Sequence, residues 1–182
     1  MLVTSRPALA GIRPLSPGLL LEAQAALARH AGRIVHTDRI GIADFSRASS
    51  EPRLFVVDMS SGRMTPYLVA HGRGSDPEHT GWVERLSNAP GSYASSAGAY
   101  MTGATYAGAH GRSMRLVGLE PTNDNAEARA IVVHAAWYVT PEIVREKGKL
   151  GRSEGCFAVS SDSLASILDQ LGPGRLLFAA KA

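Results

Sequence analysis

The sequence contains one cysteine, Cys156, which directly follows Gly155 in a loop punctuated by glycine. Upstream, residues 131–133 form a short apolar, β-branched run that is typical of a buried strand, and His134 follows it. Cysteine-dependent acyl transfer needs a thiol nucleophile and a base such as imidazole. Because strand ends and the loops beside them often meet at one rim of a sheet, we expect Cys156 and His134 to lie together.

Gly155 indicates a third element of such a site, a place where an oxyanion can bind. Glycine lets the chain turn sharply and leaves the neighbouring peptide N–H groups unshielded. We expect the N–H groups of Gly155 and Cys156 to face the oxyanion, where each such donor typically lowers the barrier by about 2.7–4 kcal/mol.

Structural interpretations of the same residues stay open. A lone cysteine is most often a small buried hydrophobe, and His134 could be a core histidine bonded to backbone. His71 and His110 each precede a glycine, so they either line a cleft or stabilise turns. The histidine spacings match no zinc pattern such as His-Glu-x-x-His, so neither a metal nor an organic cofactor is expected.

The pattern of apolar residues predicts a mainly β fold, a sandwich or barrel-like sheet with a few short helices at its edge. Ser16 and Pro17 suit the N-cap and first position of a helix, and Gly32 ends the helical spacing that follows. Residues 72–98 are rich in Gly, Ser, Pro and Asn, which favours a long functional loop. Further strands are expected at 39–45, 54–59, 64–71, 100–106, 113–119, 131–134 and 176–179, and further helices at 125–129 after a cap at Asn123, at 141–147, and after a cap at Ser161.

The composition is that of a globular protein of one domain, with 45% hydrophobic and 19% charged residues in a chain of 182. The net charge is +3 and the basic residues are scattered, which argues against nucleic acid as a partner. No apolar run approaches the ~20 residues of a transmembrane segment. Residues 1–15 lack the apolar stretch of a signal peptide, so the chain is either cytoplasmic or begins after a removed signal.

Two segments together resemble the active-site signature of the murein L,D-transpeptidases with a YkuD-type catalytic domain. They are 131–138 (Ile-Val-Val-His-Ala-Ala-Trp-Tyr) and 150–156 (Leu-Gly-Arg-Ser-Glu-Gly-Cys). The second resembles the divergent branch of that family, whose loop reads Gly-Arg-Ser-x-Gly-Cys. Segments 71–75 and 110–113 also look like that branch, and the resemblance extends over roughly residues 36 to 180.

The resemblance implies a role for each matching residue. Cys156 matches the nucleophile, and His134 matches the histidine that activates it. The backbone carbonyl of Ala135 matches the group that orients the histidine, and Gly155 matches the glycine whose backbone helps to form the oxyanion hole. Ser153 matches the Ser/Thr position of the loop.

This chain departs from the common family pattern at two positions. Glu154 stands where the common loop has a second histidine, and Ala158 stands where an Arg or Asn is usual. Arg152 is a candidate to take over carboxylate recognition, because its planar fork suits a bidentate carboxylate. The candidate substrate-binding residues are Arg152, Ser153, Tyr100, Trp137 and His110.

The function that the resemblance implies is transfer of a peptidoglycan stem peptide from D-Ala to an amine, through a thioester on Cys156, to give a 3–3 cross-link. Carbapenem-type β-lactams are the implied inhibitors, and the cell envelope or periplasm is the implied location. An L,D-carboxypeptidase that uses water, or a non-catalytic peptidoglycan-binding module, are the alternatives. We expect residues 1–35 to form an N-terminal segment with one helix packed on the domain, and 36–182 to form the catalytic domain itself.

Overall fold

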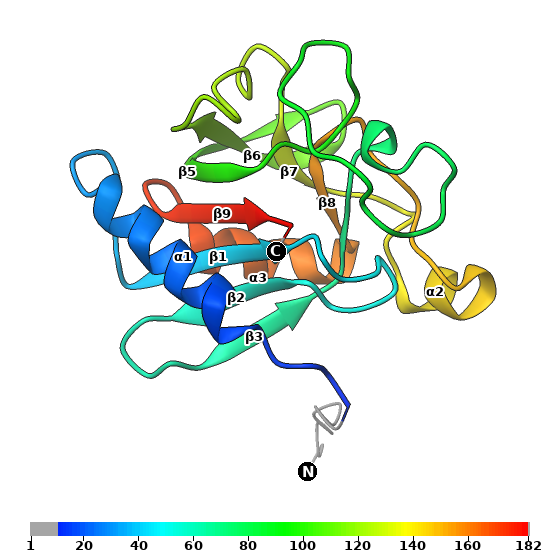
Figure 1. Ribbon diagram of the computed structural model, residues 1–182, viewed down its shortest axis with the longest axis horizontal. Coiled ribbons are helices and arrows are strands. Elements are labelled where there is room, and N and C mark those ends of the chain that lie inside the picture. Colours follow the sequence, from blue (N-terminus) through cyan, green and yellow to red (C-terminus); the bar gives the residue numbers. More distant parts are fainter. Residues whose placement is uncertain (1–10, 182) are drawn as a thin grey trace.

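The structure is a computed structural model, and it describes residues 11–181. Nine strands form one mixed sheet in the order β3-β2-β1-β9-β5-β6-β7-β8-β4 (Figure 1). The prediction of a mainly β fold with a few short helices is therefore confirmed. The strands are β1 (Arg39–Asp44), β2 (Leu54–Asp58), β3 (Met64–Tyr67), β4 (Val69–Ala70), β5 (Gly98–Gly108), β6 (Gly111–Gly118), β7 (Val132–Ala135), β8 (Phe157–Val159) and β9 (Leu176–Ala180).

The sheet curls strongly, because its two outermost strands are joined by a single residue. β3 and β4 stand at opposite ends of the strand order, yet only Leu68 separates them along the chain. The two edges must therefore lie close together. The predicted strand over residues 64–71 is in fact this pair of short strands, which pair with different neighbours, β2 and β8.

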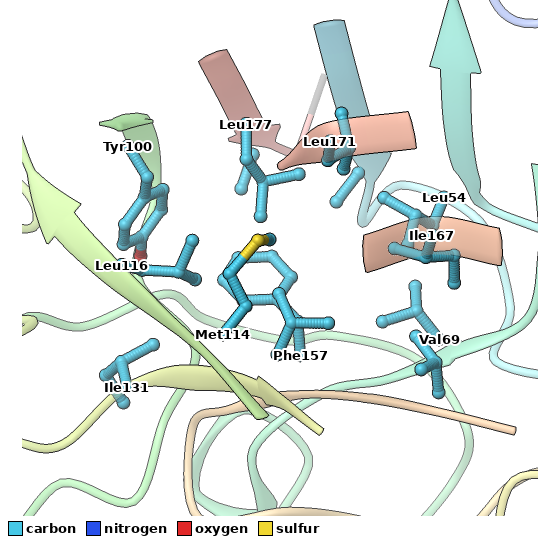
Figure 2. Packing of buried hydrophobic residues seen from close by; sticks show 14 of the residues in the cluster. Leu54, Val69, Tyr100, Met114, Leu116, Ile131, Phe157, Ile167, Leu171 and Leu177 are labelled. Carbon is cyan, nitrogen blue, oxygen red and sulfur yellow. The ribbon is translucent and has the colours of Figure 1, made fainter. Parts of the chain in front are cut away.

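The central strands are buried on both faces. Successive side chains of a strand point to opposite faces, and in β9 Leu177 packs into one apolar cluster while Leu176 and Phe178 pack into another. The first cluster fills the concave side of the sheet and is centred on Phe157 and Met114 (Figure 2). Burial on both faces explains why these strands read as continuous apolar runs.

Two helices cover the two faces. Helix α3 (Ser161–Leu171) turns Leu164, Ile167, Leu168 and Leu171 toward the concave side. Helix α1 (Pro17–Arg29) packs Leu19, Ala23 and Ala26 against the other face, in front of β1 in Figure 1. The predicted cap of α1 is present, since the Ser16 hydroxyl accepts a hydrogen bond from Leu19 N at 3.1 Å.

Two details of the helix prediction need correction. The N-cap of α3 is Ser160, not Ser161, and its hydroxyl accepts from Ser163 N at 3.2 Å. The segment 121–130 forms consecutive turns instead of a helix at 125–129. Asn123 is fully buried and donates its side-chain amide to Ala99 O at 2.8 Å, so it ties this segment to β5 and does not cap a helix.

The third helix, α2 (Pro141–Lys147), agrees with the prediction, with Thr140 as N-cap and Gly148 at its C-terminus in the left-handed region. Among residues 11–181, no helix is long and apolar enough to cross a membrane.

One strand that matters for the site was not predicted. β8 has only three residues and begins directly after Cys156. It runs parallel to β7, with Val133 opposite Phe157 and His134 opposite Ala158. Extending this register places Cys156 diagonally from His134, on the same face of the sheet.

Candidate active site

Cys156 and His134 line one cavity of about 390 Å³ at the rim where β7 and β8 lie side by side. The expectation that the thiol and the imidazole lie together is thus met by their positions. A larger hollow, of about 570 Å³, lies between β3 and α2, but its lining holds no thiol or imidazole. The smaller cavity is lined by Arg73, His110, Arg129, Ala130, His134, Tyr138, Arg152, Ser153, Glu154 and Cys156.

The imidazole of His134 is held in one orientation by the main chain. Its Nδ1 lies 2.8 Å from the carbonyl oxygen of Ala135, which is the contact that the family resemblance implies. Because a carbonyl can only accept, Nδ1 must carry the proton, and Nε2 is left with a free lone pair. Burial lowers the pKa of His134, the Ala135 carbonyl raises it in part, and the charge of His110 lowers it further. A neutral imidazole with an accepting Nε2 is suited to act as a base.

The thiol of Cys156 is partly buried and donates to the carbonyl oxygen of Ala130 at 3.5 Å. Burial raises its pKa above the ordinary value, while the N–H of Val132 and the charge of Arg129 offset part of that rise. Ala130 has φ +53, an uncommon value for a residue other than glycine, and such strain is often found at functional sites. The raised pKa of the Cys156 thiol and the lowered pKa of the His134 imidazole both favour the neutral forms at neutral pH.

The turn before the thiol requires glycine. Gly155 has φ +117, and a Cβ atom there would lie 2.7 Å from Ala94 O and 2.9 Å from a methyl group of Ile131. The N–H of Gly155 donates to Ser153 Oγ at 3.2 Å, so it is already engaged and does not face the cavity as expected. The N–H of Cys156 has no acceptor in the described part of the chain, which leaves it as the backbone donor beside Sγ.

The loop that carries the thiol is fixed to segment 71–73 by backbone hydrogen bonds. Ser153 N donates to His71 O at 2.9 Å, and Arg73 N donates to Ser153 O at 2.7 Å. Ser153 Oγ also donates to Cys156 O at 2.7 Å, so its hydroxyl closes the turn and is not available to a substrate. Gly72 permits this approach, since a Cβ there would lie 2.8 Å from Gly155 N.

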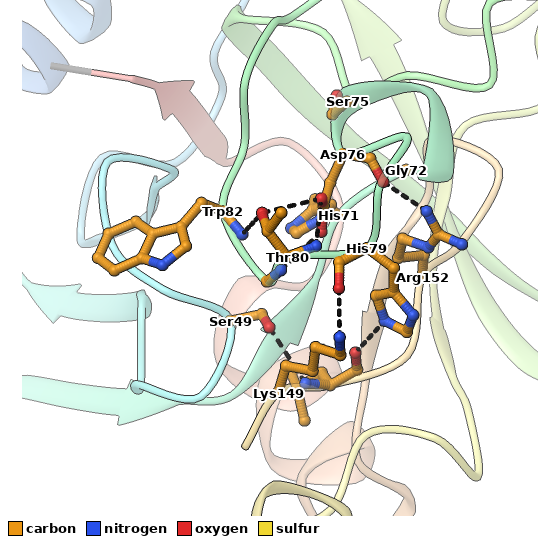
Figure 3. A network of polar contacts seen from close by, with 12 residues as sticks. Ser49, His71, Gly72, Ser75, Asp76, His79, Thr80, Trp82, Lys149 and Arg152 are labelled. Carbon is orange, nitrogen blue, oxygen red and sulfur yellow. Dashed lines mark hydrogen bonds and ion pairs between the residues drawn. The ribbon is translucent and has the colours of Figure 1, made fainter. Parts of the chain in front are cut away.

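A buried polar network supports this loop from behind (Figure 3). Arg53 Nη2 donates to His71 Nδ1 at 2.6 Å, and His71 Nε2 lies 3.2 Å from Asp76 Oδ2. Burial lowers the pKa of His71 to about 3, and the charge of Arg53 lowers it as well. His71 is therefore a neutral bridge between an arginine and an aspartate, and it stabilises the loop from outside the cavity.

Arg152 is held in place by the same segment. Its Nη1 donates to the carbonyl oxygens of Asp76 and Pro77, as Figure 3 shows for the first of them. Arg152 lines the cavity and also lines an adjoining hollow of about 270 Å³ that Trp137 borders. Arg152 therefore lies where a substrate-binding residue is expected.

His110 stacks on the catalytic candidate His134. The two ring centroids are 4.3 Å apart and the ring planes differ by 18°. His110 comes from the turn between β5 and β6, so the sequence alone gave no reason to expect this contact.

The aromatic candidates lie in different places. Tyr100 is fully buried in the core (Figure 2), and its hydroxyl donates to Ser96 O at 2.9 Å, so its prediction as a groove residue is wrong. Trp137 is 75% exposed and borders the hollow next to the thiol. Its role in substrate binding stays a prediction.

Four residues of the cavity wall were not singled out from the sequence: Arg73, Arg129, Ala130 and Tyr138. Arg73 lies 3.8 Å above the Tyr93 ring and forms an ion pair with the exposed Glu154 at 3.3 Å. Burial raises the pKa of Tyr138 to about 12. Arg73 and Tyr138 lie in segments 71–75 and 131–138, which resemble the family, but nothing in the sequence indicates that their side chains reach the cavity. Arg129 comes from the turns at 121–130, which only the folded sheet brings to the thiol.

The curled mixed sheet carries, beside its parallel strands β7 and β8, a cavity whose wall contains both a thiol and an imidazole. The model of the L,D-transpeptidase catalytic domain family matches residues 15–180, and the chain therefore belongs to this family. That match also includes the whole of helix α1, which shares a core with the sheet.

Solved structures of low sequence identity are similar to the chain. An L,D-transpeptidase from Mycobacterium smegmatis is 16% identical, with a TM-score of 0.47, over 79% of this chain and 58% of that one. L,D-transpeptidase 3 from Mycobacterium tuberculosis in complex with a faropenem-derived adduct is 14% identical, with a TM-score of 0.46, over 79% and 60%. The helical cell shape determining protein Pgp2 from Campylobacter jejuni is 11% identical, with a TM-score of 0.48, over 92% and 57%.

The chain thus matches less than two thirds of the length of these three solved proteins. Among curated proteins, no sequence matches it.

Proposed function

We propose that this protein is a cysteine-dependent L,D-transpeptidase that acts on peptidoglycan stem peptides. The observation that carries the proposal is the shared cavity of Cys156 and His134, with Nδ1 of His134 on the Ala135 carbonyl. Family membership supports the substrate class. Since peptidoglycan lies outside the cytoplasmic membrane, the proposal also places the protein in the cell envelope.

In the first step, Nε2 of His134 takes the proton from Cys156 as Sγ attacks the carbonyl carbon of the third stem residue. The N–H of Cys156 donates to the oxyanion that forms. The bond to D-Ala then breaks, and the imidazolium gives its proton to the departing amine. Thiol and imidazole are neutral before the reaction, so the charge separation arises only as the substrate reacts.

In the second step, an amine of a neighbouring stem attacks the thioester and loses a proton to His134. The carbon–sulfur bond breaks, and the thiol is restored by that proton. This sequence yields a cross-link between two third residues. If water takes the place of the amine, the product is a trimmed stem, and the enzyme is an L,D-carboxypeptidase.

The test is incubation of the protein with sacculi that contain tetrapeptide stems, followed by muropeptide analysis and intact-mass measurement after carbapenem treatment. We expect 3–3 cross-linked muropeptides and a covalent carbapenem adduct, both absent from Cys156→Ala. A protein that forms no adduct and changes no muropeptide would contradict the proposal. Binding to sacculi that persists in Cys156→Ala without any turnover would favour the alternative of a binding module.

A further inference from the structure

Two arginines in the wall of the active-site cavity have no acidic partner among residues 11–181. Arg129 and Arg152 are absent from every ion pair in this part of the chain, although both line the cavity with Cys156. The only acidic residue in the lining, Glu154, pairs with Arg73 instead. The cavity around the thiol therefore carries an excess of fixed positive charge.

Arg129 is fixed behind the Gly155 turn. Its Nη1 donates to Ser87 O at 3.0 Å, and its Nη2 donates to Ala94 O at 2.5 Å. The same Nη2 is 3.0 Å from the place where a Cβ on Gly155 would be, so the guanidinium touches the turn that carries the thiol. Two carbonyl partners fix its orientation and leave its charge unneutralised.

Arg152 is also fixed by backbone carbonyls. Only its Nη1 is engaged, by the carbonyls of Asp76 and Pro77. A guanidinium has five N–H donors, so each of these two arginines keeps donors that are free for a ligand. Each arginine also reaches an adjoining hollow, Arg152 the one beside Trp137 and Arg129 one of about 180 Å³ beside Tyr93.

The proposed donor presents carboxylates on both sides of the bond that is cleaved. The terminal carboxylate of D-Ala lies on the leaving side. A second carboxylate is present on the other side when the third residue is a diamino dicarboxylic acid, and it is lost when that group is amidated. Guanidinium forks bind carboxylates in bidentate fashion, and a carboxamide offers neither the charge nor the second acceptor.

We propose that Arg129 and Arg152 form an anion-binding subsite. This subsite selects donor stems that have free carboxylates on both sides of the scissile bond. This inference rests on the proposed function, and it assigns that function a donor of stated chemistry. Amidated donors are poor substrates for this protein.

The experiment compares synthetic tetrapeptides that differ only in one carboxylate. One donor has both carboxylates free, a second carries a carboxamide on the third residue, and a third ends in D-alaninamide. D-Ala or D-alaninamide release gives kcat/KM for each. We expect the fully free donor to be preferred about 10-fold or more over each amide, the size of one lost charge-assisted contact.

The two ratios are kcat/KM of the fully free donor divided by kcat/KM of each amide donor. Arg129→Gln and Arg152→Gln are each expected to bring one of these ratios close to one. The corresponding Lys variants are expected to keep part of the preference for the free donor. Because each ratio compares two donors on the same enzyme, changes in thiol reactivity cancel. Arg112→Gln is the matched control, since this exposed arginine pairs with Asp169 outside the cavity and its loss changes the net charge equally. The control must keep both ratios.

A wild-type ratio of one for both amides overturns the subsite, as do ratios that neither Gln variant changes. If all donors react equally and a carbapenem adduct forms, the proposed function stands and the subsite fails. If no donor reacts and no adduct forms, the proposed function fails. The subsite is then decided by calorimetric binding of the same three peptides to the intact protein, where equal dissociation constants overturn it.

Discussion

The ring of His110 lies flat against the ring of His134, with their centroids 4.3 Å apart. Burial lowers the pKa of His134, and the charge of the exposed His110 lowers that pKa further. The stacked pair therefore keeps His134 neutral as the pH falls. It also makes the His134 imidazolium a stronger acid toward the leaving amine.

His110→Asn is expected to raise the pKa of His134 toward 6.5, because it removes both the neighbouring charge and part of the ring's cover. The acid limb of the pH profile of carbapenem acylation then moves to higher pH. The measurement is the second-order acylation rate as a function of pH. Arg112→Gln on the same hairpin is the control, and an unchanged acid limb in His110→Asn would show that the stack has no electrostatic effect.

The neutral thiol–imidazole pair predicts a broad pH range of activity. The pKa of His134 lies below 6.5 and that of Cys156 above 9.0, both chiefly because burial disfavours the charged forms. We expect the acylation rate to hold a plateau between these values and the ultraviolet absorbance of a thiolate to be absent at neutral pH. Thiolate absorbance at pH 7 that disappears in Cys156→Ala would reveal an ion pair instead.

Gly155→Ala is expected to abolish most activity and to cost at least about 2 kcal/mol of stability, since the residue has φ +117 and a Cβ would meet Ala94 O. Gly148→Ala is the matched control. It also has a positive φ, of +70, but a Cβ there has nothing within 4 Å, so the cost is about 1 kcal/mol and activity stays near wild type. Chemical denaturation and the acylation rate check both variants, and equal losses of activity would refute the steric argument.

The network behind the loop predicts acid sensitivity. The pKa of His71 is about 3 in the folded protein and near 6.5 when unfolded, so the unfolded state binds the extra proton first. The free energy of unfolding therefore falls as the pH is lowered from 6.5 toward 3, by on the order of 4 kcal/mol from this residue. Denaturation curves of wild type and His71→Asn between pH 7 and about pH 4 measure it. Parallel curves for the two proteins would remove His71 as the cause.

Tyr100 and Trp137, the two aromatic residues predicted to bind substrate, are expected to respond differently to substitution. Tyr100→Phe should lower stability by about 1–2 kcal/mol, because the buried Ser96 carbonyl and hydroxyl lose their partner. Trp137→Ala should change stability by less than about 0.5 kcal/mol and raise the donor KM, since the indole is 75% exposed beside the cavity. Thermal melts and donor kinetics separate the two effects. An unaltered KM in Trp137→Ala would exclude the indole from the substrate groove.

The amino-acid sequence alone was enough to predict the mainly β class, most strands, and the thiol and imidazole candidates. Local chemistry carries these features: a β-branched run for β7, a serine and a proline at the start of α1, and glycine directly before Cys156. The strand β8 was not predicted, and β4 was predicted only as part of one longer strand over residues 64–71, because two or three residues carry too little periodicity to be recognised.

The tertiary structure alone decided which residues surround the thiol. Arg129 lies behind Gly155 and His110 lies on His134 because β5, β6, β7 and β8 are neighbours in the sheet, a relationship that no residue type or spacing encodes. It also decided that Tyr100 packs in the core and Trp137 at the surface, since burial depends on which elements cover a side chain. The sequence therefore identifies the candidate reacting groups of this protein. Only the folded sheet brings Arg129 and His110 next to them.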